Sequence, residues 1–122
     1  MNVKQNLEQI NEHITKSLEK VHRDTRPNVI AVTKYVTIER AKEAYDAGIR
    51  HFGENRLEGF QAKREALPDD VVMHFIGTLQ SRKVKEVIDD IDYLHALDRK
   101  SLAKEINKRA SHVVKCLSLI HI

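Results

Sequence analysis

Hydrophobic positions recur at helical spacing along the first twenty or so residues. The apolar side chains stand three or four positions apart, with polar and charged residues between them: Val3, Leu7, Ile10, Ile14, Leu18 and Val21. This pattern predicts an amphipathic helix whose apolar stripe packs against a core. The helix is expected to end before residues 24–27, because the residue before Pro27 is pushed away from helical geometry.

From residue 29 onward, short apolar runs alternate with amphipathic stretches. The runs predict strands at residues 29–33, 49–53, 71–76, 91–97 and 112–116. Between them, helices are predicted to carry residues 38–45, 57–67, 84–88 and 102–110. Thr37, Ser81 and Asp98 are expected to cap three of these helices, whereas Gly48 and Pro68 are expected to end two of them.

The repeat of strand and helix has a period of about 20 residues, which is typical of βα units in a parallel sheet. The runs are short and almost wholly apolar, as expected for strands covered on both faces. Spacing alone fits either a doubly wound open sheet or a barrel. The first strand is followed by neither of the glycine-rich phosphate-binding motifs, which favours the barrel. We therefore predict an α/β fold: about the first half of a (β/α)8 TIM-type barrel, preceded by an amphipathic helix. A whole barrel needs roughly 250 residues.

Composition narrows the functional classes. Hydrophobic residues make up 41% and charged residues 32% of the 122 positions, as in soluble globular proteins. The net charge is +3, but basic and acidic residues are interleaved and aromatics are only 5%, which argues against nucleic acid as a partner. No apolar run approaches the roughly 20 residues of a membrane helix, and the start lacks a signal-peptide layout. The single cysteine, Cys116, suits a reducing cytoplasm and is expected to be a small core residue.

Ligands of parallel α/β folds bind at the carboxyl ends of the strands. Lys34 follows the first predicted strand and shares a strand face with Ile30 and Val32. An amine at the end of an apolar wall is partly desolvated, which favours its neutral form and makes it a nucleophile toward aldehydes. The alternative is a lysine whose ammonium reaches out to water from the strand end.

Two further positions carry candidate chemistry. Asn55 follows the second predicted strand, where it could donate a hydrogen bond to a ligand oxygen or cap the next helix. His74 lies within the third strand, where a histidine satisfied within the core is the usual explanation. Residues 77–81 lead into a helix and form either an anion-binding turn or a plain capped turn. The seven histidines show no metal-ligand spacing and no serine triad can be placed, so neither a metal site nor catalytic residues are predicted.

Five motifs in order resemble one family. They are IAVTK at 30–34, FGEN at 52–55, HFIG at 74–77, LQSRK at 79–83 and LHALD at 94–98. Together with the leading helix, they resemble the pyridoxal phosphate homeostasis proteins, which are single-domain barrels similar to the N-terminal barrel of alanine racemase. The resemblance covers residues 1 to about 116.

The resemblance implies a cofactor, pyridoxal 5'-phosphate, held as a Schiff base on Lys34, with Asn55 and His74 facing its ring. Such proteins have no established turnover and are thought to buffer or deliver the cofactor. We therefore expect a cofactor-binding protein rather than an enzyme, with cofactor-dependent apo-enzymes as possible recipients and a monomer or weak dimer as the intact form. Two alternatives stay open. One is an enzyme, either a Schiff-base aldolase or a racemase-like catalyst, for which Tyr35 and Tyr93 are poorly placed as a second acid or base; the other is a scaffold in which Lys34 is structural.

The chain departs from the family after the fifth strand. Family members continue with three further βα units and hold the cofactor phosphate with residues late in the barrel. We expect residues 1–116 to form the barrel half and residues 117–122 to be a non-native tail, hypothetically read from a transposon-type sequencing adapter. A half barrel is expected to leave two open sheet edges and to bind phosphate weakly.

Overall fold

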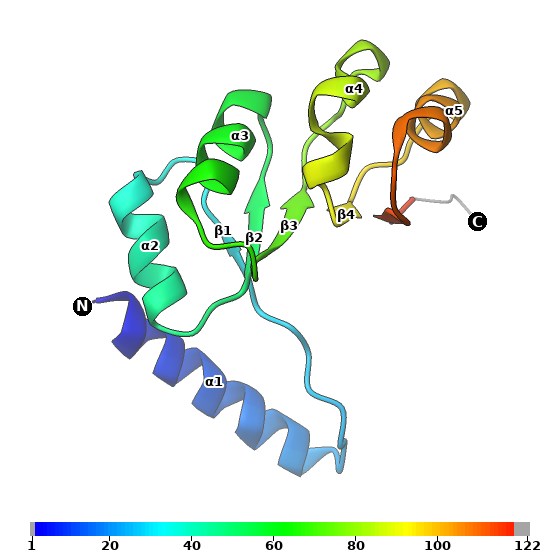
Figure 1. Ribbon diagram of the computed structural model, residues 1–122. Coiled ribbons are helices and arrows are strands. Elements are labelled where there is room, and N and C mark those ends of the chain that lie inside the picture. Colours follow the sequence, from blue (N-terminus) through cyan, green and yellow to red (C-terminus); the bar gives the residue numbers. More distant parts are fainter. Residues whose placement is uncertain (1, 119–122) are drawn as a thin grey trace.

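The sheet is parallel and its strands follow one another in chain order. The computed structural model describes residues 2–118 and contains one five-stranded sheet in the order β1-β2-β3-β4-β5, with every neighbouring pair parallel (Figure 1). The strands are β1 (Ile30–Val32), β2 (His51–Glu54), β3 (Val72–Phe75), β4 (Tyr93–Leu94) and β5 (Lys115–Cys116). A doubly wound sheet reverses its strand order at a switch point, whereas here each strand lies beside its predecessor. The predicted partial barrel is therefore confirmed.

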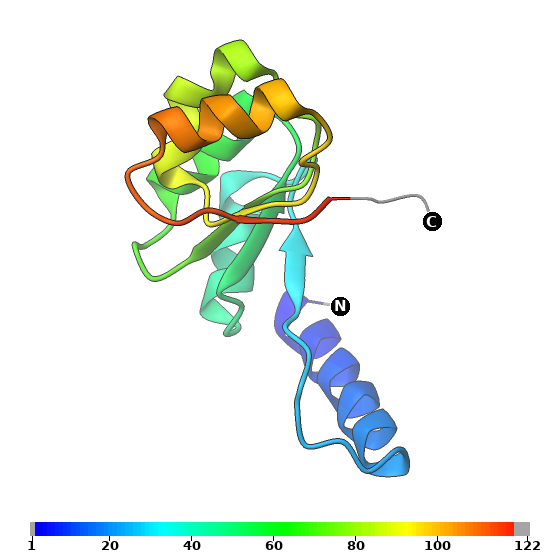
Figure 2. The same ribbon diagram turned by 90° about the vertical axis from the view of Figure 1, so that its right-hand side faces the viewer.

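Four helical segments cover one face of the sheet. They are α2 (Ile38–Asp46), α3 (Leu57–Ala66), α4 (Val84–Val87) with flanking 3-10 turns (Ser81–Lys83 and Ile88–Asp90), and α5 (Lys100–Arg109). Figures 1 and 2 show them side by side along the curved sheet, while α1 (Val3–Lys20) meets α2 at its first turn and otherwise extends away from these four helices. Within residues 2–118, no helix packs on the other face of the sheet, which would be the interior of a closed barrel.

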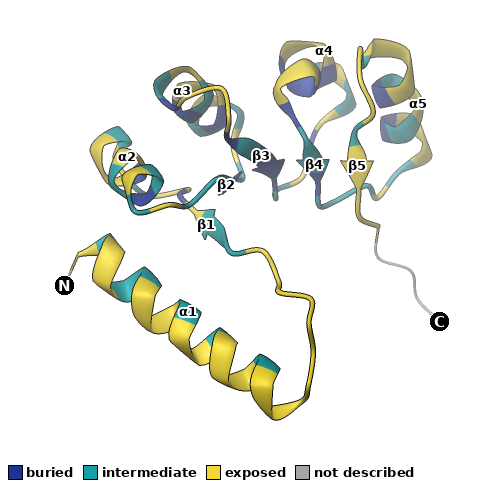
Figure 3. Cartoon of the chain, turned by 60° about the horizontal axis from the view of Figure 1, so that its bottom comes forward, coloured by how far each residue is buried: buried dark blue, intermediate teal, exposed yellow. Residues whose placement is uncertain are grey.

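The hydrophobic core fills the space between the sheet and α2–α5. Its strand members are Phe52, Met73, Phe75 and Leu94, and its main helix members are Phe60, Val84, Val87, Leu102 and Ile106. Figure 3 shows the corresponding buried stretches on the facing sides of strands and helices. Side chains alternate between the two faces of a strand. Residues next to these core positions in β2, β3 and β4 therefore point to the uncovered face.

The predicted caps are confirmed in part. The Thr37 side chain accepts a hydrogen bond from the Arg40 backbone N–H at 3.2 Å, and Gly48 follows the helix with φ +112, a conformation that favours glycine. The other two caps were wrong. Ser81 lies inside a 3-10 turn, and the extended residue before α5 is Arg99, one position after Asp98. Asp98 is therefore too early to reach the first helical N–H groups and pairs with the Arg99 guanidinium at 2.8 Å instead.

Helix α1 forms as predicted, and its apolar stripe meets the core at Val3, although no residue of the helix is fully buried. Ile10 is 47% exposed. The Val3 backbone N–H donates to Glu43 of α2 at 3.1 Å, and Arg26 donates to the Thr15 hydroxyl at 2.8 Å. The helix therefore contacts its neighbours near its first turn and through the following loop. No helix within residues 2–118 is long and apolar enough to cross a membrane.

The strands also differ from the prediction that both of their faces would be covered. Because helices pack on one face only, Val32 of β1 is 53% exposed rather than buried. Cys116 is exposed, contrary to its expected place in the core, because no element covers β5 on its far side. The ladder continues one residue beyond β5, since the Leu117 backbone N–H donates to the Leu94 carbonyl at 2.8 Å. Residues 119–122, part of the segment predicted to be non-native, lie outside the described residues.

Candidate functional site

Lys34 lies at the carboxyl end of β1, in a turn that presents its amine to solvent. The turn spans residues 33–36 and is closed by a hydrogen bond from the Val36 backbone N–H to the Thr33 carbonyl at 3.2 Å. The Lys34 Nζ atom lies 5.5 Å from the centre of the Tyr35 ring. Within residues 2–118 it has no hydrogen-bond or ion-pair partner. Lys34 is exposed, so its amine reaches out to water, as in the alternative interpretation, and is not desolvated at the end of an apolar wall; it remains accessible to an aldehyde.

Asn55 follows β2, the strand beside β1, and lies at the same end of the sheet. Its backbone packs against Gly77, the loop residue after β3, so closely that a Cβ atom at Gly77 would collide with it. The Ile76 backbone N–H donates to the Glu54 carbonyl at 2.8 Å and holds these two strand ends together. Asn55 does not cap α3, because the extended residue before that helix is Arg56. Its amide lines a pocket of about 320 Å³ together with Phe75, Thr78 and Leu79.

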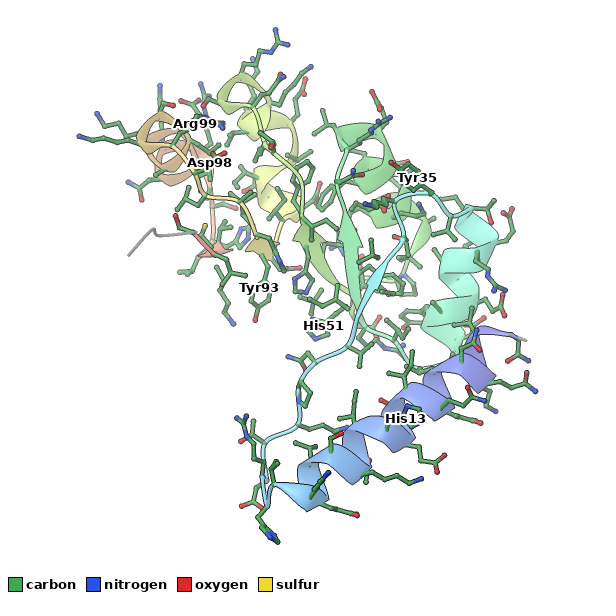
Figure 4. All side chains as sticks on the ribbon, turned by 180° about the vertical axis from the view of Figure 1, so that it is seen from behind. His13, Tyr35, His51, Tyr93, Asp98 and Arg99 are labelled. Atoms are coloured by element: carbon green, nitrogen blue, oxygen red, sulfur yellow. The ribbon has the colours of Figure 1, made fainter. Side chains whose placement is uncertain are left out.

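His74 lies at the centre of a chain of three imidazoles on the uncovered face. Its Nε2 atom lies 2.9 Å from His51 Nδ1, and its Nδ1 atom lies 2.8 Å from His95 Nε2. The Tyr93 ring stacks on it with centroids 4.5 Å apart, and the Tyr93 hydroxyl accepts a hydrogen bond from Lys115 at 3.3 Å. The face that would line the barrel interior is therefore polar around His74. Figure 4 labels His51 and Tyr93 on this face of the sheet. Tyr35, Asp98 and Arg99 lie nearer the carboxyl ends of the strands.

Burial keeps the His74 ring uncharged. The side chain is 3% exposed, and desolvation, reinforced by the neighbouring charges of His95 and His51, lowers its pKa to about 4. A neutral imidazole has one N–H donor and one acceptor nitrogen. Because both nitrogens of His74 have a histidine partner, hydrogen bonds along the three rings must all run in one direction. His74 can therefore keep both of these hydrogen bonds while its ring stays neutral.

Glu54, the residue before Asn55, faces the other way. Its carboxylate is 1% exposed on the helix side of the sheet, where it contacts Thr33 and Lys63. It therefore cannot touch a ligand on the uncovered face. Among the described residues, no group of His, Cys, Asp and Glu side chains has the arrangement of a metal site.

The structure brings the predicted residues onto three adjacent strands. Lys34 and Asn55 lie just past the ends of β1 and β2, whereas His74 lies within β3, deeper on the uncovered face. Sequence reasoning missed the other members of the polar face: His51, Tyr93, His95 and Lys115. Their signal was strand alternation combined with register, since Gly53 pairs with His74 and His74 pairs with Tyr93 across the sheet. Only the register shows that His51 and His95 flank His74.

Comparison with known proteins places the chain among relatives that share one name. It is 41% identical over 112 residues, 90% of its own length and 49% of the relative, to the pyridoxal phosphate homeostasis protein of Aquifex aeolicus. It is 34% identical over 124 aligned residues, 98% of the chain and 53% of the relative, to that of Pasteurella multocida. The chain thus spans about half the length of the curated relatives it matches. No family model matches it.

Solved structures agree in fold. PipY of Synechococcus elongatus, solved with pyridoxal phosphate bound, superposes with a TM-score of 0.61 at 34% identity, covering 78% of this chain and 47% of PipY. A protein of unknown function from Bifidobacterium adolescentis superposes with a TM-score of 0.78 over 93% of this chain and 58% of its own. Its 24% identity supports the shared fold alone.

Proposed function

We propose that this chain, which spans about half the length of the pyridoxal phosphate homeostasis proteins it is similar to, supplies the covalent anchor of a pyridoxal phosphate site. The observation that carries the proposal is the exposed, uncommitted amine of Lys34 at the carboxyl end of β1, one strand away from Asn55 and two from His74. The protein would hold the cofactor as a Schiff base and release it to cofactor-dependent apo-enzymes. The proposed compartment is the cytoplasm.

The residues present fit the group. Bound pyridoxal phosphate supplies an aldehyde carbon, with which a neutral amine forms a C=N bond while the aldehyde oxygen leaves as water. Lys34 presents an amine that no carboxylate of the described chain pairs with. The Asn55 amide makes no hydrogen bond within residues 2–118, and its N–H groups at the same end of the sheet are suited to a phenolic oxygen. His74 adds an uncharged wall, since its ring stays neutral at physiological pH.

We propose binding without turnover. A racemase needs a second acid or base on the far side of the cofactor. Tyr35 is 80% exposed, and the Tyr93 hydroxyl accepts a hydrogen bond from Lys115 while its ring stacks on His74. The Tyr35 ring projects into solvent and the Tyr93 hydroxyl is engaged by Lys115, so the described chain holds neither in place as an acid or base. Incubation with pyridoxal phosphate and L-alanine in deuterium oxide is expected to give no exchange at the α-carbon beyond that of the cofactor alone. Faster exchange that depends on the protein would support the racemase-like alternative.

The anchor is tested by borohydride reduction in the presence of pyridoxal phosphate, followed by peptide mass mapping. The expected product is a reduced adduct on Lys34, absent from Lys34→Arg, which keeps the charge but cannot form the C=N bond. Lys42→Arg, on the exposed side of α2, is the matched control and should label like the wild type. The experiment is run on the 122-residue chain and on a completed barrel. If neither carries the label at Lys34, the scaffold interpretation replaces this proposal.

A further inference from the structure

Two opposite charges are buried directly behind the strand end that carries Lys34. Glu54 is 1% exposed and Lys63 of α3 is 4% exposed, and Lys63 Nζ lies 3.3 Å from Glu54 Oε1. Removing two charges from water is costly, and a buried ion pair commonly stabilises a fold less than apolar residues of the same volume would. A contribution to stability is therefore a weak explanation for the presence of this ion pair.

Its hydrogen bonds converge on Thr33, the residue before Lys34. The Thr33 hydroxyl donates to Glu54 Oε2 at 2.9 Å, and Lys63 Nζ donates to the Thr33 carbonyl at 3.1 Å. Thr33 itself is 4% exposed. Both carboxylate oxygens are thus engaged, and three elements are joined at one point: the end of β1, the end of β2 and α3.

The Thr33 carbonyl has a second role. It also accepts the Val36 backbone N–H at 3.2 Å, the hydrogen bond that closes the turn in which Lys34 lies. The ammonium of Lys63 therefore holds the same oxygen atom that defines the turn. This carbonyl belongs to the peptide bond that joins Thr33 to Lys34, so Lys63 contacts the backbone immediately before Lys34.

Helix α3 is shaped to admit this contact. Gly59 faces Glu54, and a Cβ atom at Gly59 would lie 2.6 Å from Glu54 Oε1. Glycine disfavours helices by about 1 kcal/mol relative to alanine. The helix thus carries an unfavourable residue where the carboxylate needs room.

We propose that the Thr33–Glu54–Lys63 network is a positioning device that fixes the turn carrying Lys34 and so sets the reactivity of its amine toward pyridoxal phosphate. The inference rests on the proposed function of Lys34. The three residues lie on the helix side of the sheet and touch no ligand, so they act through the backbone. A network of this kind constrains geometry because each of its members has a hydrogen-bond partner within it.

The test compares the charge-free double variant Glu54→Leu/Lys63→Met with a surface control. Glu12→Gln/Lys16→Met removes an ion pair of α1 whose side chains are 63% and 69% exposed and which lies far from Lys34. Two readouts are taken: the apparent affinity of pyridoxal phosphate trapping at Lys34, and the pH profile of Lys34 acetylation by acetic anhydride in the cofactor-free protein. The second reports the amine itself and needs no bound cofactor.

The double variant is expected to fold, to trap the cofactor at Lys34 about tenfold more weakly and to shift the acetylation profile, whereas the control matches the wild type. A tenfold change corresponds to about 1.4 kcal/mol. If the double variant does not fold, Thr33→Val, which removes one hydroxyl at nearly constant volume, carries the test with the same expected direction. A folded variant within twofold of the wild type in both readouts would overturn the inference. A wild type that traps nothing at Lys34 would instead overturn the proposed function.

Discussion

His74 illustrates how, at the scale of one residue, burial decides protonation. Its sequence context, an apolar strand, predicted a satisfied histidine, and the two imidazole partners confirm that part of the interpretation. The groups that face it are His51, His95, Tyr93 and Asp92, of which Asp92 alone favours the charged ring. Desolvation lowers the pKa of His74 more than the Asp92 carboxylate raises it, so the folded protein resists protonation of His74.

A dependence of stability on pH follows. The unfolded chain protonates His74 near its ordinary pKa of 6.5, and the folded protein does so only near 4. Between these values the unfolded state binds more protons, so the free energy of unfolding falls as the pH decreases from 6.5 to 4, by at most about 3 kcal/mol. Urea unfolding at pH 7.0, 5.5 and 4.5 measures the loss.

The same unfolding series with His74→Gln should show a flatter dependence over this window. His13→Gln, on the exposed side of α1, is the matched control and should keep the wild-type slope. If His74→Gln loses as much stability as the wild type, another group is responsible for the pH dependence.

Gly59 gives a second prediction at this scale. In an ordinary helix, glycine to alanine stabilises by about 1 kcal/mol. At Gly59 the added methyl group would meet Glu54 Oε1, which Lys63 holds in place on its buried side. Overpacking costs about 1–3 kcal/mol, so Gly59→Ala should lower the free energy of unfolding measured in urea. An increase would mean that the carboxylate moves aside freely.

At the scale of elements, α2–α5 each bury residues in the core, whereas α1 meets the core with the partly buried Val3. Helix α3 buries Phe60 completely against Phe75, with ring centroids 5.8 Å apart. Helix α1, although strongly amphipathic, buries no residue and meets the rest of the chain near its first turn. Amphipathic periodicity therefore predicted a helix in both cases, but it did not predict how far the apolar side of each helix is buried.

This difference predicts unequal effects of truncation. Phe60→Ala should cost about 3–5 kcal/mol of unfolding free energy, because it opens a cavity in the core. Ile10→Ala in α1, at a position 47% exposed, should cost less than about 1 kcal/mol. Chemical denaturation of the two variants side by side provides the measurement. Equal losses would show that α1 contributes to the core in solution.

At the scale of the whole molecule, the sheet is an open arc. Strands β1 and β5 are its two ends, and Val32 and Val113 lie near them with 53% and 86% exposure. A pocket of about 330 Å³ lined by Leu97, Ile106 and Val114 adjoins β5. Open parallel edges with apolar neighbours invite pairing with another chain.

The 122-residue chain should therefore self-associate. Sedimentation velocity is expected to show a weight-average mass that rises with concentration above the 14.1 kDa of one chain. Val32→Lys with Val113→Lys should reduce this association, because charge at a sheet edge opposes pairing. A single 14.1 kDa species over a wide concentration range would contradict the prediction.

The sequence by itself determined the alternation of strands and helices, because apolar periodicity and the Thr37 and Gly48 signals are local. It also placed Lys34 and Asn55 at strand ends, since both follow apolar runs directly. Cap positions at Ser81 and Asp98 were missed by a residue or more, because several polar residues there compete for the same role.

The tertiary structure decided what no local pattern carries. Register joined His51, His74 and His95, and the packing of α3 turned Glu54 toward Lys63. Because the helices of the described residues cover one face of the sheet and not the other, Val32 and Cys116 remain exposed. The histidine pairs lie 23 and 21 positions apart and the Glu54–Lys63 pair nine, and the energies of these contacts exist only once the strands and helices have packed.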